Sequence, residues 1–214
     1  METDRIKVKT LIASLVAVIS IELAARFVAL KIEYSPMAIL GVVRLLEIIL
    51  MILVVQNREK GTSSIGLGRS KILHGIRRGL IWSAGFGAVT LIAFILLFFA
   101  GINPLRLIQA NLPAHYNEIF LFFLVGGVVG PVGEEVFFRG ILYSFFRRWG
   151  VWVALGVSTF IFIAAHPAFP KILFAQVIGG IVFAIAYEVE KNLMVPIIVH
   201  VLGNAAILAM PLIW

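Results

Sequence analysis

Long apolar runs separated by short polar segments dominate the chain. Seven such runs cover residues 10–30, 37–55, 80–100, 118–149, 151–165, 171–189 and 193–213. A helix crosses the hydrocarbon core of a bilayer with roughly 20 apolar residues. The pattern therefore predicts an all-α fold, a polytopic transmembrane helical bundle of about seven spans. We expect the fourth run to be one long helix interrupted near residues 130–133, where glycine and proline gather.

The composition agrees with a lipid environment. Hydrophobic residues make up 61% of the 214 residues and charged residues 14%, and the mean hydropathy is +1.06. A soluble domain carries about 25% charged residues. We therefore expect a single integral membrane domain over residues 1–214. The absence of Cys excludes disulfides, thiolate zinc sites and a cysteine nucleophile.

The basic residues lie mainly at the ends of the apolar runs, which indicates membrane topology rather than nucleic-acid binding. With a cytoplasmic N-terminus, twelve Lys and Arg residues fall on the cytoplasmic side and three outside. Residues 56–79 are the longest polar segment, and they predict a basic cytoplasmic loop with an interfacial helix. These features favour a multi-pass integral membrane protein, and the compact chain favours a prokaryotic cytoplasmic (inner) membrane.

Several charged residues fall within the first two runs. Glu22 and Arg26 are spaced i,i+4, and Arg44 and Glu47 are spaced i,i+3. Both spacings place opposite charges on one face of a helix. We expect two structural ion pairs, each within its own helix.

The fourth run holds the densest group of charges, Glu134, Glu135 and Arg139. Each charge at membrane depth costs roughly 3 kcal/mol on insertion scales, so three within six residues indicate a function. Successive helix residues point about 100° apart. Glu135 and Arg139 can therefore pair along one face while Glu134 projects into a cavity.

Two of the four histidines, His166 and His200, lie in or at the ends of predicted spans. Asn204 follows His200 at i+4 and faces the same way. An apolar pocket disfavours the charged form of a carboxylate, and such a carboxylate suits general-base catalysis. With a histidine it can activate water, while a histidine and an amide donor stabilise an oxyanion. This chemistry is acyl hydrolysis, with a peptide bond as the natural substrate inside a membrane.

The sequence lacks the residues on which other classes of protease depend. The only aspartate is Asp4, in the N-terminal tail, which excludes an intramembrane aspartyl dyad. The sequence contains neither a His-Glu-x-x-His zinc motif nor a Gly-x-Ser-x-Gly elbow. A glutamate remains as the candidate base.

Three alternatives stay open. Glu134, His166 and His200 are also a possible ligand set for catalytic zinc, although we expect no cofactor and no metal. A non-catalytic immunity factor or scaffold would use the same charges for structure alone. A proton-coupled transporter would show repeat symmetry, which the sequence does not display.

Three motifs in order resemble the CAAX protease and bacteriocin-processing family, also called the Abi family. They are Glu134-Glu135-Val136-Phe137-Phe138-Arg139, the segment from Phe162 to His166, and the segment from His200 to Asn204. The resemblance covers roughly residues 118–210, the expected catalytic core, and residues 1–117 match no motif. It implies a glutamate-type intramembrane endopeptidase.

The resemblance also implies roles for single residues. Glu134 resembles the catalytic base that polarises water with His166, and His200 and Asn204 resemble the oxyanion-stabilising pair. Glu135, Arg139 and Phe162 resemble the support of the site. The partners expected are a membrane-embedded protein or peptide substrate and the lipid bilayer. The oligomeric state is not indicated.

Overall fold

The computed structural model describes residues 6–30, 35–107, 112–113, 115–166 and 174–212, and these residues form helices, turns and loops without a strand. The helices are α1 (Val8–Ala29), α2 (Pro36–Arg58), α3 (Ile72–Phe99), α4 (Tyr116–Leu124), α5 (Gly130–Glu135), α6 (Ser144–Phe146), α7 (Val151–Ala164), α8 (Phe174–Glu190) and α9 (Met194–Ala209). Five short 3-10 helices are η1 (Thr62–Ile65), η2 (Arg69–Lys71), η3 (Pro104–Leu107), η6 (Arg147–Trp149) and η7 (Met210–Leu212). Two π-helical segments, η4 (Val125–Val129) and η5 (Val136–Tyr143), connect α4, α5 and α6.

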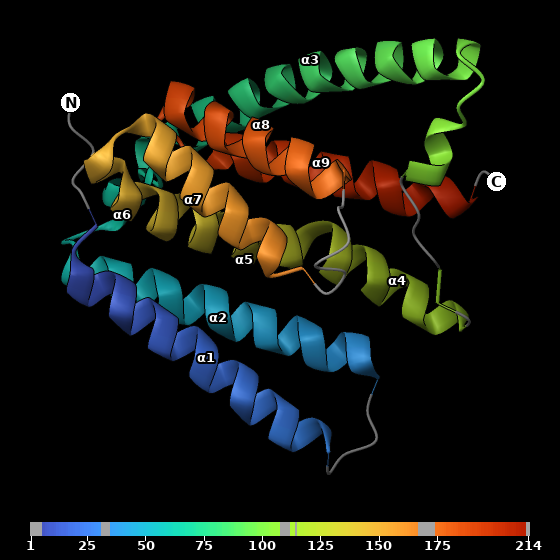
Figure 1. Ribbon diagram of the computed structural model, residues 1–214. Helices are drawn as coiled ribbons and strands as arrows, with labels where there is room; N and C mark the ends of the chain where they lie inside the picture. Colours follow the sequence, from blue (N-terminus) through green and yellow to red (C-terminus); the bar gives the residue numbers. More distant parts are fainter. Residues whose placement is uncertain (1–5, 31–34, 108–111, 114, 167–173, 213–214) are drawn as a thin grey trace.

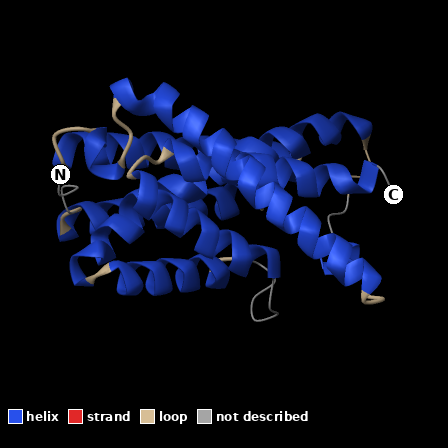
Figure 2. Cartoon of the chain, turned by 90° about the horizontal axis from the view of Figure 1, so that it is seen from above, coloured by secondary structure: helices blue, strands red, loops and turns tan. Residues whose placement is uncertain are grey.

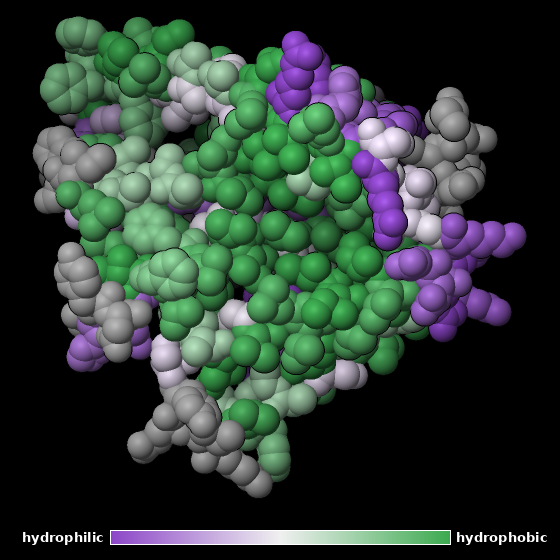
Figure 3. All heavy atoms as spheres, turned by 180° about the vertical axis from the view of Figure 1, so that it is seen from behind, coloured by the Kyte–Doolittle hydropathy of each residue, from purple (hydrophilic) through white to green (hydrophobic). Residues whose placement is uncertain are grey.

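The helices form a bundle of seven rods in the described part of the chain, with α4, α5 and α6 sharing one rod (Figure 1). Five helical stretches are long and apolar enough to cross a membrane, α7 is a shorter apolar helix, and α8 is described from Phe174. Apolar side chains cover most of the face in Figure 3, and hydrophilic side chains gather at the end where the N-terminus lies. The prediction of an all-α, multi-pass membrane bundle is confirmed.

The fourth span departs from the predicted interruption. Residues 118–149 form one continuous helical stretch, and the irregularity takes the form of wide π turns on both sides of α5. A Cβ on Gly130 would lie 3.0 Å from the carbonyl oxygen of Val125, so a larger residue would crowd the first wide turn. Such π segments occur frequently at functional sites. They flank the pair of glutamates here.

Two glycines one turn apart bring α3 close to α9 and to the connection that precedes α9. A Cβ on Gly75 would come within 2.5 Å of the Asn192 side chain, and one on Gly79 within 2.7 Å of Ile198 Cβ. This small-xxx-small arrangement permits close packing of membrane helices. From this contact α3 crosses the bundle obliquely (Figure 2). Residues 72–78 are its first turns, so the helix expected in the loop continues into the span.

Ion pairs connect the helices at the hydrophilic end, which is the predicted cytoplasmic side. Arg78 Nη2 lies 2.6 Å from Glu190 Oε1, and Arg147 Nη2 lies 2.9 Å from Glu188 Oε1. The first pair connects α3 to α8, and the second connects η6 to α8. These contacts fix the ends of the spans relative to one another.

The first two helices form a hairpin whose charges pair differently from the prediction. Arg44 pairs with Glu47 within α2, as expected from the i,i+3 spacing. Glu22, however, pairs with Arg44 of α2 at 3.2 Å rather than with Arg26 of its own helix. The seam between the two helices offers Glu22 a shielded partner, whereas Arg26 is exposed.

Candidate active site

A buried cluster of three side chains joins α5, η5 and α9. Glu135 and Arg139 are fully buried, and Arg139 Nη1 donates a 2.9 Å hydrogen bond to Glu135 Oε1. The same oxygen lies 2.7 Å from Nδ1 of His200. The i,i+4 spacing produces the first contact, as the sequence predicted. The second contact connects residues that the sequence analysis had placed in separate roles.

Several neutral groups around the cluster accommodate the Arg139 guanidinium. Arg139 Nη2 donates to the backbone carbonyl of Gly180 at 3.0 Å. Its guanidinium carbon lies 4.6 Å from the centre of the Phe162 ring and 5.3 Å from that of Phe183. Aromatic faces attract a desolvated cation. Arg139 therefore connects the fourth span to α7 and α8.

Glu134 lies near the other ring nitrogen of His200, Nε2. Its side chain is 30% exposed, yet its Oε2 is buried and has no hydrogen-bond partner among the described residues. This oxygen lies 3.8 Å from His200 Nε2. The separation is too long for a direct hydrogen bond. Glu134 and His200 thus face one point from two helices.

Side chains lie beside both nitrogens of His200 and against one face of its ring. Its side chain is 5% exposed, and its two nitrogens face the two adjacent glutamates. The imidazole stacks on Phe183 with ring centres 4.4 Å apart and an interplanar angle of 22°. Carbonyl and carboxylate partners commonly fix the tautomer and orientation of a functional histidine. Glu135 has that function for His200.

His166 follows the end of α7 and approaches the site through Phe162. Its Nδ1 lies 2.7 Å from the Phe162 carbonyl oxygen. A carbonyl only accepts, so Nδ1 donates, and Nε2 of a neutral ring is then an acceptor. The Phe162 ring lies 4.6 Å from the His166 ring and 6.0 Å from the His200 ring, between centres. Phe162 therefore spaces the two imidazoles.

Asn204 lies one turn beyond His200 on α9 and contacts the first wide turn of the fourth span. Its Nδ2 donates a 3.0 Å hydrogen bond to the carbonyl oxygen of Gly126 in η4. An amide nitrogen carries two hydrogens, so one further donor remains on this side chain. The contact ties α9 to η4 and fixes the height of His200 beside α5.

The sequence analysis missed three contributors to this site. Gly126 and Gly180 act through their carbonyl oxygens, and Phe183 acts through its ring. A carbonyl acceptor exists at every position, so no sequence pattern marks the two glycines. Phe183 sits among many apolar residues of α8 and carries no distinguishing neighbour.

The zinc hypothesis gains no support from the geometry. Within the described ranges, no group of three or more His, Asp or Glu residues is arranged to hold a metal ion. In this site His200 Nδ1 and His166 Nδ1 are both engaged in hydrogen bonds, which leaves the Nε2 atom of each ring available.

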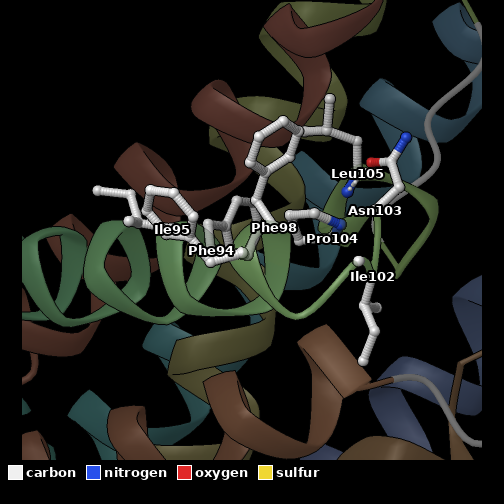
Figure 4. Close-up of a pocket in the computed structure, with 9 residues that line it drawn as sticks. Phe94, Ile95, Phe98, Ile102, Asn103, Pro104 and Leu105 are labelled. Carbon is white, nitrogen blue, oxygen red and sulfur yellow. Dashed lines mark hydrogen bonds between the residues drawn. The ribbon is translucent and has the colours of Figure 1, made fainter.

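A separate cavity of about 660 Å³ lies at the end of α3, near η3 (Figure 4). Its lining is apolar apart from the amide of Asn103, and includes Phe94, Phe98 and Leu105. Among the described residues no ionisable side chain lines it, so this part of the lining lacks the groups that hydrolysis requires.

Comparison with known proteins matches the region that contains the site. The family model described as type II CAAX prenyl endopeptidase Rce1-like covers residues 116–206. The membrane-embedded CAAX protease MroQ of Staphylococcus aureus (strain USA300) is 33% identical over 102 residues, which cover 44% of this chain and 40% of MroQ. The putative membrane peptidase YdiL of Bacillus subtilis (strain 168) is 30% identical over 93 residues, 43% of this chain and 38% of YdiL.

A third relative is an uncharacterized 24.3 kDa protein of Escherichia coli, 27% identical over 129 residues, 57% of this chain and 59% of the relative. The matches thus span between 38% and 59% of the length of these curated relatives. No solved structure gives a significant match. The matched region holds all three motifs and every side chain of the buried cluster. Residues 116–206 of this chain thus match the Rce1-like CAAX endopeptidase family model, in agreement with the resemblance of the three motifs.

Proposed function

We propose that this protein is a glutamate-type intramembrane endopeptidase, which hydrolyses a peptide bond of a membrane-associated protein or peptide. The observation that carries the proposal is the 3.8 Å gap between Glu134 Oε2 and His200 Nε2. Both atoms belong to a site in which Glu135 and Arg139 are fully buried. A carboxylate oxygen without a hydrogen-bond partner, 3.8 Å from a histidine nitrogen, fits a general base.

In the proposed reaction, a water molecule lies against Glu134 and the acceptor nitrogen of His166. Its oxygen forms a bond to the carbonyl carbon of the substrate while Glu134 takes the proton. The carbonyl electron pair moves onto its oxygen, and His200, when protonated, and the second amide hydrogen of Asn204 stabilise this oxyanion. The intermediate then collapses, the C–N bond breaks, and Glu134 passes the proton to the leaving amine.

The hydrogen bonds in the structure support this division of roles. His166 donates through Nδ1 to Phe162, which leaves Nε2 to accept from water. His200 directs Nδ1 to Glu135 and Nε2 toward the gap, where a donor is needed. The names of MroQ and YdiL, a membrane-embedded protease and a putative membrane peptidase, support the same substrate class.

The test compares membrane proteomes of a bacterial host that expresses either the wild-type chain or Glu134→Gln. We expect new protein termini that appear with the wild type and are absent with Glu134→Gln. Glu118→Gln, at the start of the same helical stretch, is the matched control and should give the wild-type set of termini. Identical termini for wild type and Glu134→Gln, at equal protein levels in the membrane, would falsify the proposal.

A further inference from the structure

Burial along the fourth span changes at the two glutamates. From residue 136 to residue 145, all residues but one are buried. From residue 118 to residue 130, most residues are half-buried or exposed. The side chain of Glu134 is 30% exposed, whereas that of Glu135 is fully buried. The glutamates therefore lie between a closely packed half and a less closely packed half of this span.

The polar connection between α2 and α3 closes the packed half next to the buried cluster. Ile65 of η1 and Leu193 are fully buried. A Cβ on Gly140 would lie 3.3 Å from Ile65 Cβ and 3.2 Å from Leu193 Cδ2. The Leu193 N–H donates a 3.2 Å hydrogen bond to the carbonyl oxygen of Gly66. Because Gly140 directly follows Arg139, this layer adjoins the cluster on the side of the N-terminal end.

A second layer lies between the first one and the hydrophilic surface. Tyr143 and Tyr187 are buried and pack edge to face, with ring centres 5.6 Å apart. The Tyr143 hydroxyl donates to Glu188 Oε2 at 2.8 Å, and the Tyr187 hydroxyl oxygen lies 2.9 Å from Ser144 Oγ. Side chains packed at this density leave no passage for water. We call the two layers the inner seal, which consists of Ile65, Gly140, Tyr143, Tyr187 and Leu193.

The partly exposed groups of the site lie on the other side of the cluster. Helix α7 has 14 residues and begins beside η6 at the hydrophilic end. It is therefore about 21 Å long, shorter than the roughly 30 Å hydrocarbon core, and His166 follows its far end within the membrane. Asn204 lies one turn beyond His200 in the direction away from the inner seal. His166 and Asn204 are half-buried, whereas His200 is buried.

We propose that water and substrate reach Glu134 from the end of the bundle opposite the N-terminus (Figure 1). The distribution of basic residues predicts that this end is extracytoplasmic. An ionisable residue inside a membrane protein faces the bundle interior or a water-filled cavity, and the inner seal separates Glu134 from the hydrophilic end.

This inference rests on the proposed function and specifies its substrate class. The substrate is a membrane-anchored protein or peptide whose scissile bond lies in the outer half of the bilayer or beyond its outer surface. A tail that is presented in the cytoplasm would not reach Glu134.

The experiment uses single cysteines, because the natural chain has none. Glu134→Cys, Ser63→Cys on the connection after α2 and Ile102→Cys beyond α3 are treated with a charged, membrane-impermeant methanethiosulfonate. Sealed spheroplasts present the outer face to the reagent, and inverted vesicles present the inner face. We expect Glu134→Cys and Ile102→Cys to react at least about tenfold faster from the outer face. Ser63→Cys, which is exposed at the hydrophilic end, should react faster from the inner face.

Ser144→Cys is the matched control on the same helical stretch. Its side chain is buried beside the inner seal, so it should react from neither face. Thermal unfolding in detergent shows which variants are folded. Asn204→Cys gives a second readout of access to the site, because it lies on a different helix and should react from the outer face.

Several results would overturn the inference. They are reaction of Glu134→Cys and Asn204→Cys from the inner face, reaction of both from neither face in folded protein, reaction of Ser144→Cys from the inner face, and reaction of Ser63→Cys from the outer face. The cleavage sites give an independent test. Termini that depend on Glu134 should map to extracytoplasmic segments or outer membrane halves of the substrates, and cytoplasmic sites would contradict the inference.

The labelling requires no cleavage, so the two proposals can fail separately. Reaction of Glu134→Cys from the outer face, together with identical termini for wild type and Glu134→Gln, would keep the direction of access and remove the proposed function. Reaction from the inner face, together with termini that are lost in Glu134→Gln, would keep the proposed function and remove the direction of access.

Discussion

Glu135 Oε1 and His200 Nδ1 are 2.7 Å apart, although the two residues are separated by 65 positions in the sequence. The same oxygen accepts from Arg139. Glu135 therefore fixes both the guanidinium that connects the helices and the imidazole that faces Glu134. The neighbouring carboxylates thus approach different nitrogens of the same histidine, Glu135 through a hydrogen bond and Glu134 at 3.8 Å.

Replacement of Glu135 tests this double contact. Glu135→Gln keeps the shape of the side chain but leaves the buried Arg139 without its compensating charge. Breaking a buried pair from one side costs roughly 3–5 kcal/mol, so we expect a large loss of stability. We also expect kcat to fall on the order of 100-fold, because His200 loses its orienting carboxylate. Thermal unfolding in detergent and cleavage assays measure the two effects.

Glu118→Gln is the control for Glu135→Gln because it changes the same residue type on the same helical stretch. Full activity and unchanged unfolding of Glu135→Gln would contradict the role given to the Glu135–His200 contact.

Arg139→Lys is expected to destabilise the protein although it keeps the charge. Arg139 donates through two nitrogens in different directions, to Glu135 and to Gly180, and faces the Phe162 ring. An ammonium group lacks the planar fork that makes these contacts together. We expect a lower unfolding temperature and reduced kcat, with a smaller stability loss than for Arg139→Ala. An unfolding temperature equal to that of the wild type would show that charge alone is sufficient at this position.

Much of the fold could be predicted because lipid imposes a simple rule on the sequence. Runs of apolar residues gave the spans, and the i,i+4 spacing of Glu135 and Arg139 gave their pair. The predicted break in the fourth span was wrong because Gly130 permits a wide helical turn instead of an interruption. The pairing of Glu22 with Arg44 was missed because it depends on how two helices face each other.

For the site too, the sequence indicated single residues but not the contacts between residues far apart in the chain. Glu134, His166, His200 and Asn204 stood out because polar residues are rare in these spans. Their partners depend on helix packing, which the sequence pattern does not specify. Glu135 accordingly appeared only as the partner of Arg139, and its contact with His200 emerged from the fold.

Gly180→Ala should reduce activity through the ring that spaces the two histidines. A Cβ at this position would lie 3.0 Å from Thr159 Cγ2 and 3.2 Å from Phe162 Cδ1. We expect the added methyl group to displace Phe162 and with it the His166 ring that packs against it. Gly156→Ala on α7, where a Cβ meets nothing within 4 Å, is the control. Equal kcat values for the two variants would exclude this steric route to the site.

Chelators test the zinc hypothesis directly. If Glu134 and the two histidines act on water without a metal, incubation with a strong chelator followed by its removal should leave kcat unchanged. Elemental analysis of the purified, active protein should then find substoichiometric zinc. Loss of activity that is restored by added zinc, and by no other treatment, would favour a metalloprotease instead.

The close contact between α3 and α9 gives a stability prediction with an internal control. Gly79→Ala introduces a Cβ 2.7 Å from Ile198 Cβ, a branch point that has little freedom to move. Overpacking of this kind costs roughly 1–3 kcal/mol, so we expect a clearly lower unfolding temperature in detergent. Gly85→Ala, on the same helix and with no neighbour within 4 Å, should be neutral or slightly stabilising because alanine favours a helix. Equal unfolding temperatures for the two variants would mean that α3 and α9 do not meet at Gly79. Loss of activity in Gly79→Ala alone would connect this contact to His200, which lies on the same helix as Ile198.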